Sequence, residues 1–166
     1  MANHVADPKS SDVLLRDVTE SDLPILFEQQ LDPEANQMAA FAARDWEAFM
    51  AHWTRLLSDA ALIKKTILSE GQVAGNIGKW EQSGQSLIGY WIGKQYWGKG
   101  IATKALAAFL DLVKERPLYA HVAKHNIASI RVLEKCGFTI CGEEKRDSST
   151  GGEEVEEVVL ALRASD

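Results

Sequence analysis

Two glycines stand one residue apart in the stretch QYWGKGIATKALAAF, residues 95–109, where a strand-like segment gives way to a helical one. Glycine costs about 1 kcal/mol relative to alanine inside a helix, so Gly98 and Gly100 predict a loop directly before a helix. The first N–H groups of a helix have no intrahelical partner, and the helix dipole adds about half a positive charge there. This pattern predicts a site where an anion such as a phosphate touches the backbone.

A second interpretation is that the glycines only shape a strand-to-helix turn, because a short glycine pattern is weak evidence for a ligand. Two nucleotide-binding loops can be compared with the residues. A P-loop needs Ser or Thr as magnesium ligand after Lys99, where Gly100 stands, and a dinucleotide-binding loop needs a third glycine where Thr103 stands. The residues therefore argue against both loops and against an NTP-binding regulator.

The length of 166 residues predicts a single domain over residues 1–166, with residues 1–12 a flexible N-terminal segment. Hydrophobic residues at 46% and charged residues at 25% are typical of a globular protein. No apolar run approaches the roughly 20 residues that span a bilayer, and the N-terminus lacks the order of a secretory signal. We therefore expect a cytoplasmic protein without a membrane partner.

The formal net charge of −6 argues against a general nucleic-acid binder, because neutralising phosphates requires basic surface. The same charge is compatible with an amine or other cationic substrate. The only two cysteines, Cys136 and Cys141, stand at a spacing that fits neither a metal site nor a disulfide framework. We therefore expect no metal.

Hydrophobic periodicity and turn residues predict seven strands and four helices. The expected strands are residues 13–18, three strands between 61 and 93, residues 118–123, and two strands around the polar turn 147–152. The expected helices are residues 19–31, 45–57, 101–114 and a short helix from 126 that stops at Gly137, with residues 31–45 as a loop. The last strand is expected to be exposed, so that it could pair across a dimer.

Two motifs resemble those of one family. QYWGKGIA resembles the Q/R-x-x-G-x-G/A acyl-CoA pyrophosphate loop of the GNAT superfamily of N-acyltransferases, and NIASIRVLEKCGF, residues 126–138, resembles its second cofactor motif. Within the superfamily the chain looks most like the branch that includes the ribosomal-protein N-terminal acetyltransferases. The resemblance implies an α/β (α+β) GNAT fold: a mixed, mostly antiparallel twisted sheet of about seven strands, splayed between two parallel strands and flanked by about four helices.

The resemblance also implies that acetyl-CoA lies between the splayed strands 86–93 and 118–123. Backbone groups of Trp91 and Ile92 would bind the pantetheine and the thioester oxygen, and N–H groups from Trp97 to Thr103 would bind the pyrophosphate. Lys99, Arg131 and Lys135 could meet the 3′-phosphate or be ordinary exposed cations. The implied acyl-CoA contacts are Trp91, Ile92, Gln95, Trp97, Gly98, Lys99, Gly100, Ile101, Ala102, Thr103, Asn126, Ser129 and Arg131.

Acetyl transfer to an amine requires a neutral amine, donors for the developing oxyanion, and a proton for the departing sulfur. The resemblance assigns the oxyanion contact to the N–H of Ile92. Many family members carry a tyrosine four residues before the motif's glycine as the proton donor, but Leu133 stands there. Ser129 is the alternative donor, and its other interpretation is a residue near the Asn126 helix cap.

Glu81 and His121 are the candidate general bases, although each could be an ordinary strand residue and water could take the proton instead. The expected acceptor is a protein N-terminus or an amine-bearing small molecule, selected by the N-terminal helices and the 31–45 loop. We expect an acetyl-CoA-dependent N-acetyltransferase, either a monomer or a homodimer. The alternative is a non-catalytic acyl-CoA sensor or partner module on the same fold.

Overall fold

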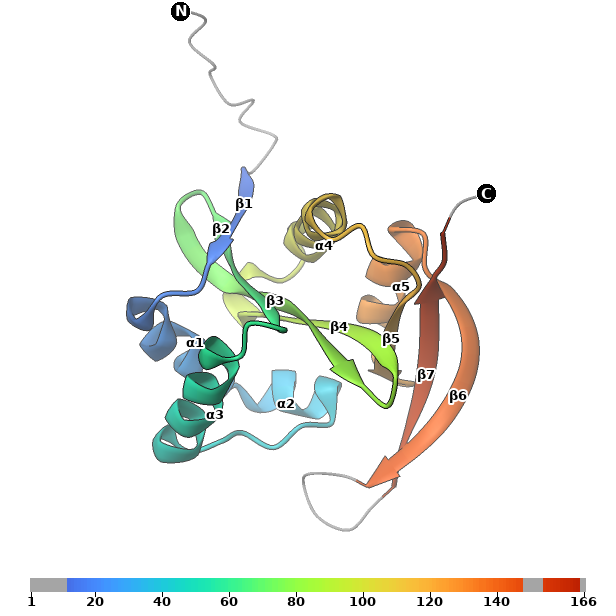
Figure 1. Ribbon diagram of the computed structural model, residues 1–166. Coiled ribbons are helices and arrows are strands. Elements are labelled where there is room, and N and C mark those ends of the chain that lie inside the picture. The colour runs from blue at the N-terminus through green and yellow to red at the C-terminus, as the bar shows by residue number, and fades with distance from the viewer. Residues whose placement is uncertain (1–11, 148–153, 165–166) are drawn as a thin grey trace, which may run out of the picture.

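The computed structural model describes residues 12–147 and 154–164 (Figure 1). The N-terminal segment expected to be flexible, apart from Asp12, lies outside the described residues, and so does most of the polar turn expected at 147–152.

Seven strands form one mixed sheet with the order β1–β2–β3–β4–β5–β7–β6. The β4–β5 pair is parallel, and the other neighbouring pairs are antiparallel. The strands are β1 Val13–Asp17, β2 Ile63–Ser69, β3 Gln72–Gln82, β4 Gln85–Ile92, β5 Leu118–Ala123, β6 Thr139–Asp147 and β7 Glu154–Leu162. The predicted mixed sheet is confirmed, but the expected exposed last strand is wrong, because β7 lies between β5 and the edge strand β6.

The parallel strands β4 and β5 diverge from one another. Their ladder contains a single register pair, Leu87 with Tyr119, near the beginning of both strands. Beyond that pair the carboxyl ends of β4 and β5 separate, which is the splay expected between the two parallel strands. The splay leaves backbone groups of β4 facing a gap in the middle of the sheet.

Five α-helices and two short 3₁₀ turns connect the described strands. They are η1 Glu20–Asp22, α1 Leu23–Gln29, α2 Pro33–Ala39, α3 Trp46–Ser58, η2 Lys94–Tyr96, α4 Ile101–Leu112 and α5 Ile127–Lys135. Residues 31–45 were expected to form a loop, and this expectation is wrong, because α2 lies within this range. Asp32 caps α2 by accepting a hydrogen bond from the N–H of Ala35 at 2.8 Å, and Pro33 occupies its first turn, two standard helix-start signals.

The helices form a layer on each side of the sheet, with α4 and α5 on one side and α1 to α3 on the other (Figure 1). Each layer has its own buried cluster. Phe109 of α4 and Leu133 of α5 belong to the larger cluster, which includes apolar residues of β2 to β5 and β7. Leu26 of α1 and Trp53 of α3 belong to the smaller one. The gap between β4 and β5 therefore opens between two packed layers.

Candidate functional site

The loop before α4 has the conformation that its glycines predict. Gly98 and Gly100 both have φ of +75°, in the left-handed region that residues with a side chain rarely adopt. A Cβ built at either glycine would meet no protein atom within 4 Å, so neither glycine is required by a neighbouring side chain. The turn interpretation is thus supported, and the space beside the loop is open to a ligand.

The beginning of α4 differs from that of three other helices. Asp32, Asp45 and Asn126 cap α2, α3 and α5 by accepting a backbone N–H, whereas Gly100 at the start of α4 supplies no side-chain acceptor. The first N–H groups of α4 therefore have neither an intrahelical nor a side-chain partner within the described residues. An uncapped helix start beside open space is a favourable place for an anion.

This helix start lines a cleft of about 610 Å³ between α2, β4, the α4 loop and α5. Ten residues of the implied acyl-CoA set line it: Trp91, Ile92, Trp97, Gly98, Gly100, Ile101, Ala102, Thr103, Asn126 and Ser129. Lys135 also lines it, whereas Gln95, Lys99 and Arg131 are exposed residues outside the lining. Sequence reasoning missed Tyr90 and the α2 residues Ala35, Met38 and Ala39.

Antiparallel pairing fixes the direction of each backbone group of β4. The N–H of Gly93 donates to the carbonyl of Ala74 at 2.8 Å, and Gly75 lies opposite Ile92. Because hydrogen-bonded and non-hydrogen-bonded pairs alternate, Gly75 and Ile92 form a non-hydrogen-bonded pair. The N–H of Ile92 therefore points away from β3 and into the gap, as the predicted oxyanion contact requires.

The same alternation corrects the expectation for Trp91. Its partner Asn76 forms a hydrogen-bonded pair with it, so the backbone of Trp91 points toward β3 and cannot reach a ligand in the gap. Consistently, a Cβ at Gly75 would clash with the carbonyl oxygen of Trp91. The residue that shares the orientation of Ile92 is Tyr90, and Trp91 contributes only its side chain to the cleft.

Ser129 forms a pair of hydroxyl groups with Tyr90 in the cleft. The Tyr90 hydroxyl oxygen lies 2.8 Å from Ser129 Oγ and also donates to the Ser129 carbonyl at 3.4 Å. The Ser129 N–H donates to the Asn126 cap at 3.3 Å, so the helix-start interpretation of Ser129 also holds. Burial raises the pKa of Tyr90 to about 12, partly offset by the Ser129 hydrogen bond, so the phenol stays protonated at neutral pH.

Leu133 stands at the usual tyrosine's position but does not line the cleft. Its side chain is 1% exposed and belongs to the cluster beneath α4 and α5. Tyr90, from β4, instead brings a phenol to the first turn of α5. The signal that could have located Tyr90 is strand alternation, which places it on the α5 side of β4, opposite to Trp91.

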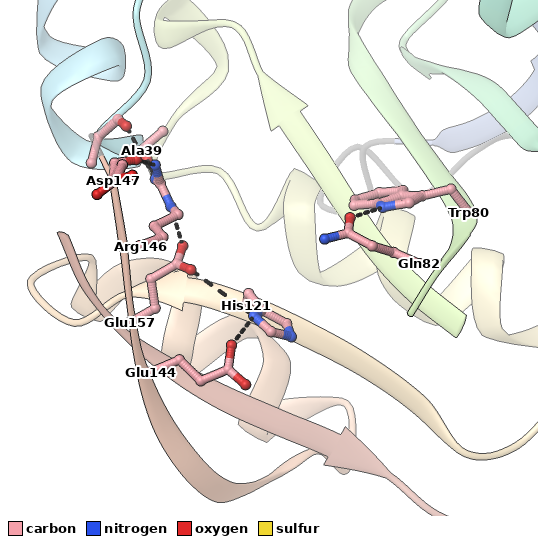
Figure 2. Close-up of polar contacts among 9 residues, drawn as sticks. Ala39, Trp80, Gln82, His121, Glu144, Arg146, Asp147 and Glu157 are labelled. Atoms are coloured by element: carbon pink, nitrogen blue, oxygen red, sulfur yellow. Dashed lines mark hydrogen bonds and ion pairs between the residues drawn. The ribbon is translucent and has the colours of Figure 1, made fainter. Parts of the chain in front are cut away.

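His121 lies on the opposite face of the sheet from Tyr90. The register pair of β4 and β5 places His121 on the same face as Trp91, which donates from Nε1 to a carbonyl of α1 at 3.2 Å. Figure 2 shows His121 Nδ1 directed toward two carboxylates, 3.4 Å from Glu144 Oε2 and 3.9 Å from Glu157 Oε1. Its Nε2 is buried without a hydrogen-bond partner among the described residues, and with Nδ1 as donor it is a free acceptor.

Glu81 is not brought to the cleft. It pairs with Lys79 Nζ at 2.9 Å and accepts from Ser86 Oγ at 2.7 Å, and both contacts lower its pKa. Ser86, opposite Glu81 in the ladder, lies six residues before Ile92 along β4, which is roughly 20 Å at strand rise. The geometry therefore separates Glu81 from Ile92.

The description "Acetyltransferase (GNAT) domain" names the family model that matches residues 12–139. The chain belongs to this family. A curated relative, "Probable N-acetyltransferase YjcK" of Bacillus subtilis, is 35% identical over 81 residues. That match covers 46% of this chain and 45% of the relative, so the chain matches less than half of the relative's length.

Solved GNAT structures share the fold of this family member over nearly its whole length. A spermidine N-acetyltransferase from Vibrio cholerae, in complex with CoA and spermine, has a TM-score of 0.78 at 16% identity and covers 91% of this chain and 95% of its own. Mycobacterium smegmatis RimJ, in complex with CoA-disulfide, has a TM-score of 0.76 at 24% identity, with coverage of 92% and 82%. At these identities the likeness concerns the fold alone.

Among the described residues, no helix combines the length and the apolar character that crossing a bilayer requires. In the same part of the chain, no three His, Cys, Asp or Glu side chains come together in a group that could hold a metal ion.

Proposed function

We propose that this GNAT domain is an N-acetyltransferase that transfers the acetyl group of acetyl-CoA to a primary amine, either a protein N-terminus or a small molecule. The observation that carries the proposal is the meeting of three features in one cleft: the uncapped start of α4, the inward N–H of Ile92 and the Ser129–Tyr90 hydroxyl pair. They match the needs of an anionic cofactor, a developing oxyanion and a leaving group.

Acetyl-CoA supplies a thioester whose carbon–sulfur bond is exchanged for a carbon–nitrogen bond, while the amine loses a proton and the sulfur gains one. The residues that would hold it are the α4 loop, the N–H of Ile92 and the lining of α5. Lys135 is the basic residue of this lining and the first candidate for the 3′-phosphate. The Ser129 hydroxyl donates toward the sulfur. The proposed branch, that of the ribosomal-protein N-terminal acetyltransferases, is based on the patterns GYWI…WGKG at residues 89–100 and N-x-x-S…EK-x-GF at residues 126–138.

The acceptor amine approaches from the face that carries His121 and Trp91. On this face the buried His121 Nε2 has no hydrogen-bond partner among the described residues, while Nδ1 is directed toward Glu144 and Glu157 (Figure 2). An imidazole oriented by carboxylates in this way is suited to accept a proton, directly or through water. His121 is therefore the proposed general base, in preference to the distant Glu81.

The test combines turnover with binding. Thiol release from acetyl-CoA is measured with a panel of amino acids, peptides, polyamines and aminated small molecules, and CoA binding is measured by calorimetry. Amine-dependent thiol release is the expected result. Tight CoA binding without release for any amine would favour a sensor or partner module, and no CoA binding would overturn the assignment of the cleft. The cytoplasmic location and the monomeric or dimeric state remain predictions.

A further inference from the structure

A group of basic side chains lies on the α1–α3 side of the sheet, although the chain as a whole is acidic. The group consists of Arg44, His52, Arg55 and Lys64, called here the cationic cluster. None of its members forms an ion pair in the part of the chain that the structure describes. Arg44 and Lys64 are partly buried, and a cation withdrawn from water without an ion pair is costly, so their unpaired state requires an explanation.

Lys64 shows the withdrawal from water most clearly. Its Nζ lies 5.6 Å from the ring centroid of Trp53 and 5.4 Å from that of Trp80. Burial lowers the pKa of Lys64 to about 8, with a further contribution from the charge of Arg44. Burial also lowers the pKa of His52 to about 4, helped by the charges of Arg44, Lys64 and Arg55, so His52 lies within electrostatic range of these three cations.

Arg44 connects the cationic cluster to the cleft. Its guanidinium carbon lies 5.0 Å from the ring centroid of Phe41, and that ring packs edge-on against Trp91 at 5.8 Å. Gln30, which is 7% exposed, fixes the Arg44 backbone: its Oε1 accepts the Arg44 N–H at 2.7 Å, and its Nε2 donates to the Arg44 carbonyl at 3.0 Å. Buried Gln30 thus fixes the backbone of Arg44. The Arg44 guanidinium lies beside the Phe41 ring, which in turn contacts Trp91 in the lining of the cleft.

The sheet register places Lys64 and His121 in one row across the same face. Lys64 lies opposite Gly78, Gly78 lies opposite Gly89, and His121 follows at the same level on β5. A Cβ at Gly78 would clash with the Lys64 side chain, and one at Gly89 would press on the Trp80 ring. The Lys64 stem and the Trp80 ring therefore lie over these two glycines, so aliphatic and aromatic groups cover the row between Lys64 and His121.

We propose that the acceptor amine carries an anionic group, a carboxylate several bonds from the nitrogen, and that Arg44 and Lys64 bind it. This inference rests on the proposed function, because it assigns the far end of the acceptor in that same site. The amine lies at the gap beside His121, and the carboxylate lies toward β2 and α3. Arg44 and Lys64 are the specificity residues, since guanidinium and ammonium groups bind carboxylates by charge-assisted hydrogen bonds.

The experiment compares glycine, glycylglycine and triglycine with their C-terminal amides, which differ in the negative charge and in its distance from the amine. We expect the free acid of at least one length to have a KM about tenfold below that of its amide, as for a charge-assisted contact. Arg44→Gln should remove this preference, and so should Lys64→Met, in which methionine keeps much of the aliphatic stem of lysine. In both variants the KM of the amide should stay within about twofold of the parent's value. Lys65→Gln is the matched control, because Lys65 is the next residue of β2 and pairs with Asp17.

A binding measurement tests the inference independently of turnover. Calorimetry with glycylglycine or triglycine, in the presence of CoA, should show weaker binding to Arg44→Gln than to the parent, whether or not product forms. Equal affinity for acids and amides would overturn the inference, and so would variants that weaken both ligands equally. Absence of turnover with carboxylate binding intact would instead count against the proposed function alone.

Discussion

The Ser129–Tyr90 hydroxyl pair gives the sharpest test of the proposed chemistry. Ser129→Ala removes a hydroxyl that lines the cleft but leaves the α5 N–H bond to the Asn126 cap in place, because that bond uses the backbone of Ser129. Removing a positioned proton donor lowers a rate by about 10²- to 10⁴-fold. We therefore expect kcat to fall in that range while the affinity for CoA changes little.

Tyr90→Phe separates positioning from donation. The change deletes the partner of Ser129 Oγ at 2.8 Å but keeps the ring that lines the cleft. One hydrogen bond between neutral groups is worth about 0.5–1.5 kcal/mol, so losing the orientation of Ser129 should lower kcat by about 2- to 12-fold. If Tyr90 only positions Ser129, then Tyr90→Phe should lower kcat less than Ser129→Ala does. Adding Tyr90→Phe to Ser129→Ala should then cause no further loss of kcat.

The assay follows thiol release under saturating acetyl-CoA, with CoA affinity from calorimetry and thermal stability as a folding check. Tyr119→Phe is the control, because Tyr119 lies on β5 and does not line the cleft. Since the pKa of Tyr90 is raised to about 12, its ionisation should produce no alkaline limb in kcat below about pH 11. A kcat for Ser129→Ala within about twofold of the parent would refute proton donation, and a larger loss in Tyr90→Phe would make the phenol the donor.

Three further predictions concern CoA binding, the stability of the fold and the need for a metal. Gly98→Val or Gly100→Val should weaken CoA binding in calorimetry far more than Gly84→Val, which has the same positive φ and open surroundings in the β3–β4 turn and so controls for strain. Asp22→Asn should lower the free energy of unfolding at pH 7 by about 2–4 kcal/mol, because Asp22 is 2% exposed and binds Arg16 through both carboxylate oxygens. Arg16 holds the pKa of Asp22 well below its usual range, so this stability is present above about pH 4 and lost as pH falls further; urea midpoints of parent and variant should converge there. EDTA should leave acetyl transfer unchanged, and activity lost to EDTA and restored by a divalent cation would contradict the expectation of a metal-free reaction.

Local signals made the α4–α5 side of the fold predictable. The α4 loop, its helix and the glycine that ends α5 are each encoded within a few neighbouring residues, and strand alternation was readable in β2 to β5. The helix α2 shows how a local signal can still be overlooked. Asp32 and Pro33 form a standard helix start, but the small and polar residues that follow give little amphipathic pattern. Its attachment depends on a distant residue, Arg146, which donates to the carbonyls of Ala39 and Ala40.

Pairings between distant segments could not be read in the same way. Ser129 was identified from its helix motif, but its hydroxyl partner Tyr90 lies 39 residues earlier and becomes visible only when β4 meets α5. The backbone directions of Trp91 and Ile92 depend on whether each forms a hydrogen-bonded pair with β3, a register that one strand alone does not contain. Glu81 was a reasonable candidate base by residue type, and only the register shows that it lies at the wrong end of β3.

Different residues lie on the two faces of the sheet beside the gap between β4 and β5. Tyr90, Ile92 and the start of α4 face the α4–α5 side, where one continuous stretch of chain from β4 to α4 provides more than half of the residues that line the cleft. On the other face, His121 of β5, Arg44 before α3 and Lys64 of β2 come from three separate segments. Two sites built from separate segments can change independently, because substitutions on one face leave the loop on the other face untouched. The acceptor should therefore be sought by varying charge along an extended amine, since Lys64 of β2, which forms no ion pair among the described residues, and His121 of β5 lie three strands apart on that face.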